Sequence, residues 1–232
     1  MYTVDELEDK LIDLSFAEDI GDGDHTTLCC IPEDAMGKSH LLIKEDGILA
    51  GVEVAKKVFA RFDDTMKVEV LIQDGAHVKK GDIAMVVTGK VRSLLQTERL
   101  MLNIMQRMSG IATMTSKYVE KLKGTKTHVL DTRKTTPGMR MLEKQAVKIG
   151  GGMNHRIGLF DMILLKDNHV DFAGGITNAI DRCHKYLEEK GLKLKIEIEV
   201  RNFDELQQVI DHGGILQVEL HKLKMALPAL VP

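Results

Sequence analysis

Cationic side chains follow two predicted strands of this 232-residue chain, at the points where the strands end. Arg133 and Lys134 follow a strand predicted over 128–132, and Lys166 follows one over 162–165. If the strands are parallel, their carboxyl ends meet at one edge of a sheet, and cations there form an anion site. A solvated basic turn is the simpler interpretation of the first pair taken alone.

A glycine-rich segment, GGGMNHR at 150–156, lies between these two strands. Its glycines would let backbone N–H groups approach a bound group, and His155 and Arg156 add donors. The spacing differs from the G-x-G-x-x-G fingerprint of dinucleotide sites. With the strand-end cations, the chain offers four fixed positive charges and an imidazole. Such a set favours a substrate with several negative charges, such as a phosphate, a diphosphate or a polycarboxylate.

The segment KIEIEV at 195–200 alternates isoleucine with glutamate, which places Glu197 and Glu199 on one face of a predicted strand. This pattern suits an amphipathic strand with a wet face. If the strand is central in a barrel, a carboxylate near its exit could instead hold ribose hydroxyls or Mg²⁺. The chain has no G-x-S-x-G or H-E-x-x-H motif, so we expect no covalent nucleophile.

Predicted helices and strands alternate after residue 93, which is typical of parallel βα units, either doubly wound or closed into a barrel. The helices are predicted over 97–108, 111–122, 139–149, 176–190 and 203–212. Before residue 93, an amphipathic helix opens the chain, with apolar positions Val4, Leu7, Leu11, Leu14 and Phe16. Strands between 39 and 91, with one helix over 52–62, predict an α+β module.

The composition is that of a globular protein, with 44% hydrophobic and 29% charged residues. A net charge of −3 gives no general reason to expect a nucleic acid or an anionic membrane as partner. Three cysteines without a disulfide pattern favour a reducing, cytoplasmic setting, and we expect neither a signal peptide nor a membrane span. The acidic loop at 18–27 lacks the twelfth-position glutamate of a calcium-binding EF-hand, because Cys30 stands there.

Four segments together resemble the quinolinate phosphoribosyltransferase family, the nicotinate-nucleotide pyrophosphorylases of NAD biosynthesis. They are ERLMLNIMQRMSGIAT (98–113), LDTRKTTPGMRMLEKQAV (130–147), GGGMNHRIGLFDMILLKDNH (150–169) and KIEIEV (195–200). The resemblance implies an α/β fold, with an N-terminal α/β sandwich domain at 1–108 and an incomplete α/β barrel at 109–232. It also implies a homodimer in which each active site borrows from the neighbouring subunit.

The resemblance implies that quinolinate and phosphoribosyl pyrophosphate, with Mg²⁺, give nicotinate mononucleotide, CO₂ and pyrophosphate. The residues it assigns to the quinolinate carboxylates are Arg133, His155, Arg156 and Lys166. Lys134 would lie near the phosphoribosyl pyrophosphate, and Glu199 would meet the ribose or its metal ion. Arg99 would reach the pocket of the partner subunit, although alone it is typical of a surface helix arginine.

This chemistry agrees with the count of cations. Displacement of pyrophosphate passes through an oxocarbenium-like state, in which cations neutralise the departing group. Loss of CO₂ then uses the quaternised pyridine nitrogen as electron sink. Cations clamped on the departing carboxylate would slow its loss, so we predict that the strongest arginine contact is made to the other carboxylate.

The resemblance ends near residue 215. The last residues, LQVELHKLKMALPALVP, match none of the family's later strands for ribose and phosphate, so we expect a truncated barrel without its final strands. Two alternatives follow from these observations. One is a weakly active or non-catalytic anion-binding remnant of the enzyme. The other is the related molybdenum-transport-associated homologue, which the R-K-T-T-P-G and N-H-R motifs disfavour.

Overall fold

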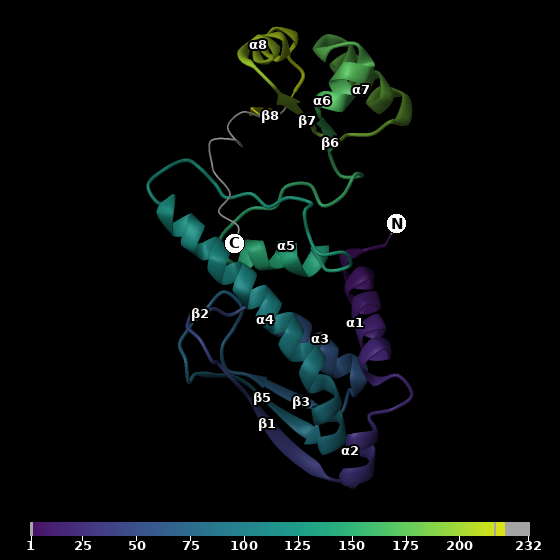
Figure 1. The fold of residues 1–232 in the computed structure, drawn as a ribbon, viewed down its shortest axis with the longest axis vertical. Coiled ribbons are helices and arrows are strands. Elements are labelled where there is room, and N and C mark those ends of the chain that lie inside the picture. The colour runs from purple at the N-terminus through teal and green to yellow at the C-terminus, as the bar shows by residue number, and fades with distance from the viewer. Residues whose placement is uncertain (1, 216, 221–232) are drawn as a thin grey trace. The chain divides into compact units, whose positions relative to one another are not determined.

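The computed structural model describes residues 2–215 and 217–220. The chain divides into two compact units between His155 and Arg156 (Figure 1). The helices of the first unit are α1 (Val4–Ile20), α2 (His25–Cys30), α3 (Val52–Phe62), α4 (Val91–Lys121) and α5 (Arg140–Ile149). Its strands are β1 (Met36–Leu42), β2 (Gly47–Ile48), β3 (Lys67–Val70), β4 (His77–Val78) and β5 (Ile83–Lys90).

The first unit has an antiparallel sheet in the order β1-β5-β3, and β2 pairs with β4. Helix α3 has the predicted bounds, and its inner face buries Val54 and Val58 with Met85 of the central strand β5. Helix α4 adds Ile104 and Met108 to the same core. This helix packs against both the sheet and α5. The predicted α+β module is confirmed.

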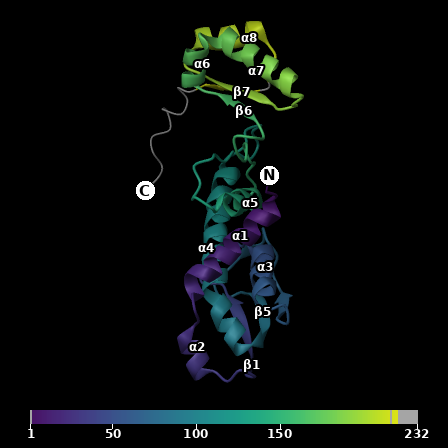
Figure 2. The same cartoon turned by 90° about the vertical axis from the view of Figure 1, so that its right-hand side faces the viewer.

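Helix α1 is confirmed, and it begins with a capping box between Thr3 and Glu6. Figure 2 shows α1 beside α3 and α4. Its expected apolar face is partly wrong, because Val4 and Leu14 are exposed. The buried face carries Glu8, whose carboxylate receives a 2.5 Å hydrogen bond from Lys57 Nζ on α3. Asp5 and Glu8 together raise the pKa of Lys57 to about 12.

Helix α4 is one helix of 31 residues, whereas the sequence predicted two, over 97–108 and 111–122. Ser109 and Gly110 lie between the two predicted helices. Ser109 instead remains helical, and its hydroxyl bonds the backbone N–H and carbonyl of Ala50 at 2.9 and 3.1 Å. A tertiary contact thus overrides a local break signal, and the helix crosses the expected domain boundary at 108/109.

The strand predicted over 128–132 is also wrong. Of that segment, only Leu130 forms a parallel bridge, to Met153. The backbone of Met153 bonds Val129 and Asp131, and the next contact is between the side chains of Asp131 and Asn154. Residues 131–136, which we call the strand-exit loop, are therefore held by side chains rather than by a sheet.

The second unit is a parallel sheet in the order β6-β7-β8, as predicted for βα units. Its elements are β6 (Ile163–Leu165), α6 (Asp167–Ala173), α7 (Ile176–Lys190), β7 (Ile196–Val200), α8 (Phe203–His212) and β8 (Gln217–Leu220). Ile180, Ile198 and Val200 form the centre of its core. The α/β class is confirmed, while α6 was missed. Strand β8 lies within the last residues, which were expected to match none of the family's later strands. The part of that expectation that concerns 221–232 falls outside the described residues. None of the described helices is long and apolar enough to span a membrane.

His212, at the end of α8, carries a pH-dependent part of the stability. Its Nδ1 lies 3.0 Å from the carbonyl of Gly213 and its Nε2 lies 2.9 Å from the Asp181 carboxylate. The carbonyl and the carboxylate favour the imidazolium, and they raise the pKa of His212 above its usual 6.5. Its stabilisation is therefore complete below the unfolded-state pKa and is lost as pH rises through the higher folded-state pKa.

We expect the unfolding midpoint of the chain to fall from about pH 6.5 upward more steeply than that of a His212→Ala variant. Asp181→Asn should show an intermediate slope, since the Gly213 carbonyl remains. Thermal melts across this pH range measure the slope of the unfolding midpoint against pH. Equal slopes for all three proteins would contradict a contribution from His212.

Candidate anion-binding site

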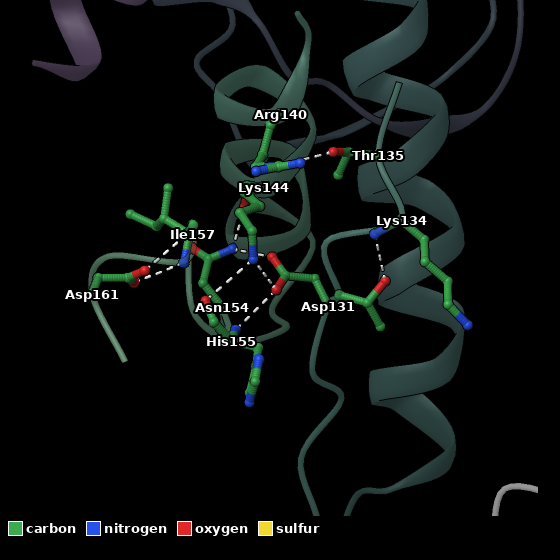
Figure 3. A network of polar contacts seen from close by, with 11 residues as sticks. Asp131, Lys134, Thr135, Arg140, Lys144, Asn154, His155, Ile157 and Asp161 are labelled. Carbon is green, nitrogen blue, oxygen red and sulfur yellow. Dashed lines mark hydrogen bonds and ion pairs between the residues drawn. The ribbon is translucent and has the colours of Figure 1, made fainter. Parts of the chain in front are cut away.

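Asp131 is the centre of a buried hydrogen-bond network in the first unit (Figure 3). Lys144 Nζ, on α5, donates to Asp131 Oδ1 at 2.5 Å, and the two side chains are only 4% and 7% exposed. Asn154 Nδ2 donates to Asp131 Oδ2, and the His155 N–H donates to Oδ1 at 2.8 Å. The network ties the strand-exit loop and the 154–155 segment to α5.

The other end of the strand-exit loop is held by the neighbouring residue of α5. Glu143 Oε2 accepts the Thr136 N–H at 3.2 Å. Arg107, on α4, donates to Glu143 Oε1 at 2.6 Å and to Thr136 Oγ1 at 2.9 Å. Helix α5 therefore fixes both ends of residues 131–136 through two consecutive charged side chains.

Arg133 and Lys134 lie between these two anchors. Arg133 is half-buried, and its Nε is buried with no hydrogen-bond partner among the described residues. Lys134 is exposed, and only its backbone N–H is bonded, to Thr132 Oγ1 at 3.0 Å. The solvated-turn interpretation thus suits Lys134 but not Arg133. A buried unpaired guanidinium N–H is costly, so Arg133 is the group most in need of a bound acceptor.

The three glycines at 150–152 do not offer their N–H groups to a ligand, contrary to the sequence prediction. Their N–H groups bond the carbonyls of Ala146, Lys148 and Val147, which ends α5. Glycine is needed here for close packing instead. A Cβ on Gly150 would overlap the Ala112 carbonyl of α4 and lie 2.8 Å from Thr115 Cβ.

We expect Gly150→Ala to lower the free energy of unfolding by about 1–3 kcal/mol through overpacking against the α4 backbone. Gly110→Ala is the matched control, because its Cβ would meet no atom within 4 Å and alanine favours a helix. That control should leave stability unchanged or raise it by about 1 kcal/mol. Urea denaturation compares the variants, and equal stabilities would show that the close packing is not required.

In the second unit, Lys166 lies at the carboxyl end of β6, whereas Arg156 contacts the residue before this strand. Lys166 follows β6 and caps α6, and its Nζ pairs with Glu199 Oε1 of β7 at 2.8 Å. The register places Leu165 beside Ile198, so both strands end at the same edge. Arg156 is buried, and its Nη1 donates to the Met162 carbonyl at 3.3 Å. This unit therefore brings together the predicted cation Lys166 and the predicted carboxylate Glu199.

Strand β7 has no wet face, because all five of its residues are buried. Glu197 and Glu199 both belong to this buried set. Among the described residues, no group of three or more His, Cys, Asp or Glu side chains could hold a metal ion. One buried carboxylate does suit a Mg²⁺ ion that takes its other ligands from a substrate diphosphate and water.

Arg99 lies exposed on α4, without a hydrogen bond or ion pair to any residue that the structure describes. This placement is that of a surface arginine, and its expected role toward a partner subunit stays a prediction. The site residues that sequence reasoning missed are Arg107, Asp131, Glu143, Lys144 and Asn154. No spacing pattern marks them, because their contacts join segments that only the fold brings together.

Two family models match most of the chain. The quinolinate phosphoribosyl transferase N-terminal domain matches residues 24–109, and the C-terminal domain of the same family matches 111–226. The models meet next to the expected boundary at 108/109, whereas the compact units divide at 155/156.

Known proteins agree with these models. A tobacco (Nicotiana tabacum) protein named quinolinate phosphoribosyltransferase [decarboxylating] 1b is 43% identical over 93% of this chain and 61% of its own length. A Bacillus subtilis protein named probable nicotinate-nucleotide pyrophosphorylase [carboxylating] is 40% identical over 88% of this chain and 70% of its own. The crystal structure of NadC from Streptococcus pyogenes superposes with a TM-score of 0.86 at 35% identity, over 97% of this chain and 80% of that one. The chain thus spans about three fifths of the tobacco relative.

Proposed function

The chain belongs to the quinolinate phosphoribosyltransferase family, and from this premise we propose that it converts quinolinate and phosphoribosyl pyrophosphate into nicotinate mononucleotide, CO₂ and pyrophosphate. The observation that carries the proposal is Arg133, whose buried Nε–H has no acceptor among the described residues. A carboxylate is the acceptor that matches a guanidinium best.

In this reaction the pyridine nitrogen of quinolinate attacks the anomeric carbon of the ribose, and the bond from that carbon to pyrophosphate breaks. The carbon–carbon bond to the 2-carboxylate then breaks, CO₂ leaves, and its electron pair takes up a proton at ring carbon 2. No protein nucleophile takes part. The cations of this chain act by orienting the dianionic acid and by neutralising the departing pyrophosphate.

The family resemblance suggests the assignments in the first unit, and the half-buried Arg133 beside the exposed Lys134 supports them. Arg133 and the imidazole of His155 would bind quinolinate carboxylates, and Lys134 would meet a phosphate of the second substrate. Arg133 would bind the carboxylate that the product keeps, because clamping the departing one would slow decarboxylation. In the second unit, Arg156 and Lys166 would add to the carboxylate contacts.

The metal ion proposed for the reaction is Mg²⁺, which neutralises pyrophosphate charge when it is bound. Glu199 is the protein group that would approach it or the ribose hydroxyls. In the structure the Lys166 ammonium occupies one of its carboxylate oxygens. A substrate that draws Lys166 to its own carboxylate would release this oxygen of Glu199 from the ammonium.

We further propose that the protein acts as a homodimer in which Arg99 of one subunit serves the site of the other, within a cytoplasmic setting. Support comes from the Arg99 side chain, which lies exposed on α4 and makes no ion pair with a residue that the structure describes. Mixing Arg99→Ala and Arg133→Ala subunits would then restore about a quarter of the wild-type activity, since mixed dimers carry one intact site. No recovery after subunit exchange would contradict a shared site.

Selective binding tests the substrate assignment. Calorimetric titration of the chain should show quinolinate binding at least tenfold more tightly than nicotinate, because each charge-assisted hydrogen bond to the additional carboxylate contributes about 1.5–3 kcal/mol. Equal affinity for the two acids, or no binding of quinolinate to the folded chain, would overturn the assignment.

A further inference from the structure

We propose that Lys144 is a positioning residue, which neutralises Asp131 and so keeps Arg133 available to a bound carboxylate without touching the substrate itself. The identity of the bound carboxylate rests on the proposed function. The effect of Lys144 on Asp131 and Arg133 concerns only contacts within the first unit. Lys144 is 3% exposed and lies on the side of α5 that faces the strand-exit loop.

Lys144 joins three segments of the first unit: α5, the loop at 131–136 and the 154–155 segment. Its Nζ bonds Asp131 Oδ1 and the His155 carbonyl, at 2.5 and 3.2 Å, and its own carbonyl accepts from Asn154 Nδ2 at 2.8 Å. These contacts are visible in Figure 3. Between α4 and α5, by contrast, the backbone forms neither a helix nor a paired strand beyond the bridge at Leu130. The position of the strand-exit loop thus depends on this side chain.

The charge of Asp131 explains why a lysine is needed. Asp131 stands two residues before Arg133, and an unpaired carboxylate there would attract that guanidinium. Lys144, Asn154 and the His155 N–H instead satisfy Asp131. Accordingly, Arg133 Nε has no hydrogen-bond partner in the described part of the chain, although Asp131 lies two residues away.

Stability alone does not account for such a pair. Burying two charges costs solvation, and apolar residues of similar volume often stabilise a core equally well. A buried pair does, however, specify one arrangement of the segments it joins. Here the segments carry Arg133 and His155, both assigned to quinolinate, so the arrangement serves the site.

The first experiment does not depend on any substrate. In the Lys144→Met variant, the Arg133 Nε–H resonance, assigned by its loss in Arg133→Lys, should shift downfield as Asp131 becomes its acceptor. In Lys144→Arg, which restores the charge, it should stay near the wild-type position. An unshifted resonance in folded Lys144→Met would overturn the inference whether or not the chain binds quinolinate.

The second experiment measures quinolinate affinity by calorimetry, at a temperature well below the melting points of all variants. Lys144→Met should bind at least tenfold more weakly, with KM raised more than kcat is lowered, and Lys144→Arg should lie within about threefold of wild type. The control is Leu142→Ala on the same helix, a fully buried residue outside the network. It should melt at a lower temperature with unchanged affinity.

Equal affinity losses in Lys144→Met and Leu142→Ala would reduce Lys144 to a structural residue and overturn the inference. If wild type itself failed to bind quinolinate, the proposed function would fall, and the resonance of Arg133 would still decide the positioning role. Should Lys144→Met not fold, Asn154→Ala removes one donor from Asp131 and should shift the same resonance in the same direction.

Discussion

An Arg133→Ala variant should lose about 10²–10⁴-fold in kcat/KM for quinolinate while its free energy of unfolding stays almost unchanged. The loss follows from removing two charge-assisted hydrogen bonds to a carboxylate, each contributing about 1.5–3 kcal/mol. Stability should hold because the Nε of Arg133 makes no hydrogen bond among the described residues. Steady-state kinetics and a thermal melt of the same preparation measure both effects.

Lys185→Ala is the control for this variant, since Lys185 is an exposed cation on α7 whose nearest carboxylate, Glu189, lies 3.9 Å away. It should leave both kinetics and melting unchanged. A fall of less than threefold in the Arg133→Ala kinetics would remove this arginine from the site. A large loss of stability would instead show that Arg133 holds the loop together.

The largest expected effect on stability is that of Lys144→Met, which should lower the free energy of unfolding by about 3–5 kcal/mol. The variant leaves the Asp131 carboxylate buried with its charge uncompensated. Asn154 and the His155 N–H still donate to it, which favours the lower end of this range. Urea denaturation of the purified variant, with the slope of the transition checked against wild type, measures the change.

The double variant Lys144→Met with Asp131→Asn tests the cause. Because it removes both charges, it should be more stable than Lys144→Met alone, with a coupling energy of about 1–3 kcal/mol. Strictly additive losses would mean that the two charges do not interact, and that the destabilisation comes from lost packing of the lysine stem.

Local patterns were sufficient where helices bury one face and carry their own end signals. Helices α3, α7 and α8 have the predicted bounds. Asn202 caps the start of α8, where its side chain accepts the Glu205 N–H, and Gly191 caps the end of α7 in the left-handed conformation. Such signals act within a few residues, so they can be read from the sequence without knowing the fold.

Tertiary contacts account for the helix and strand bounds that were predicted wrongly. Ser109 and Gly110 have the composition of a break, yet α4 continues because the core on both sides, at Met108 and Ala112, is fully buried. The segment predicted as a strand around Leu130 forms a single β-bridge, to Met153, among the described residues. In both cases the competing term comes from residues far away in the sequence, which a local pattern does not contain.

The candidate site likewise contains residues that local sequence patterns could indicate and residues that they could not. The place of Lys166 could be predicted, because a residue that follows a strand of a parallel sheet lies at its carboxyl edge, and there Lys166 meets Glu199 of the neighbouring strand. The strand expected before Arg133 and Lys134 is absent from the described residues. The buried partners of these residues could not be predicted. In the sequence, Lys144 is typical of an exposed helix lysine, and only the fold brings Asp131 against it. The alternation in β7 predicted one solvent-exposed face, whereas all five residues of the strand are buried.

The most direct test of the proposed function is product formation by the purified 232-residue chain, supplied with quinolinate, phosphoribosyl pyrophosphate and Mg²⁺. We predict equal amounts of nicotinate mononucleotide, CO₂ and pyrophosphate, with no product when nicotinate replaces quinolinate and almost none in Arg133→Ala. A folded chain that melts cooperatively, binds quinolinate and still forms no nicotinate mononucleotide would contradict the proposed activity.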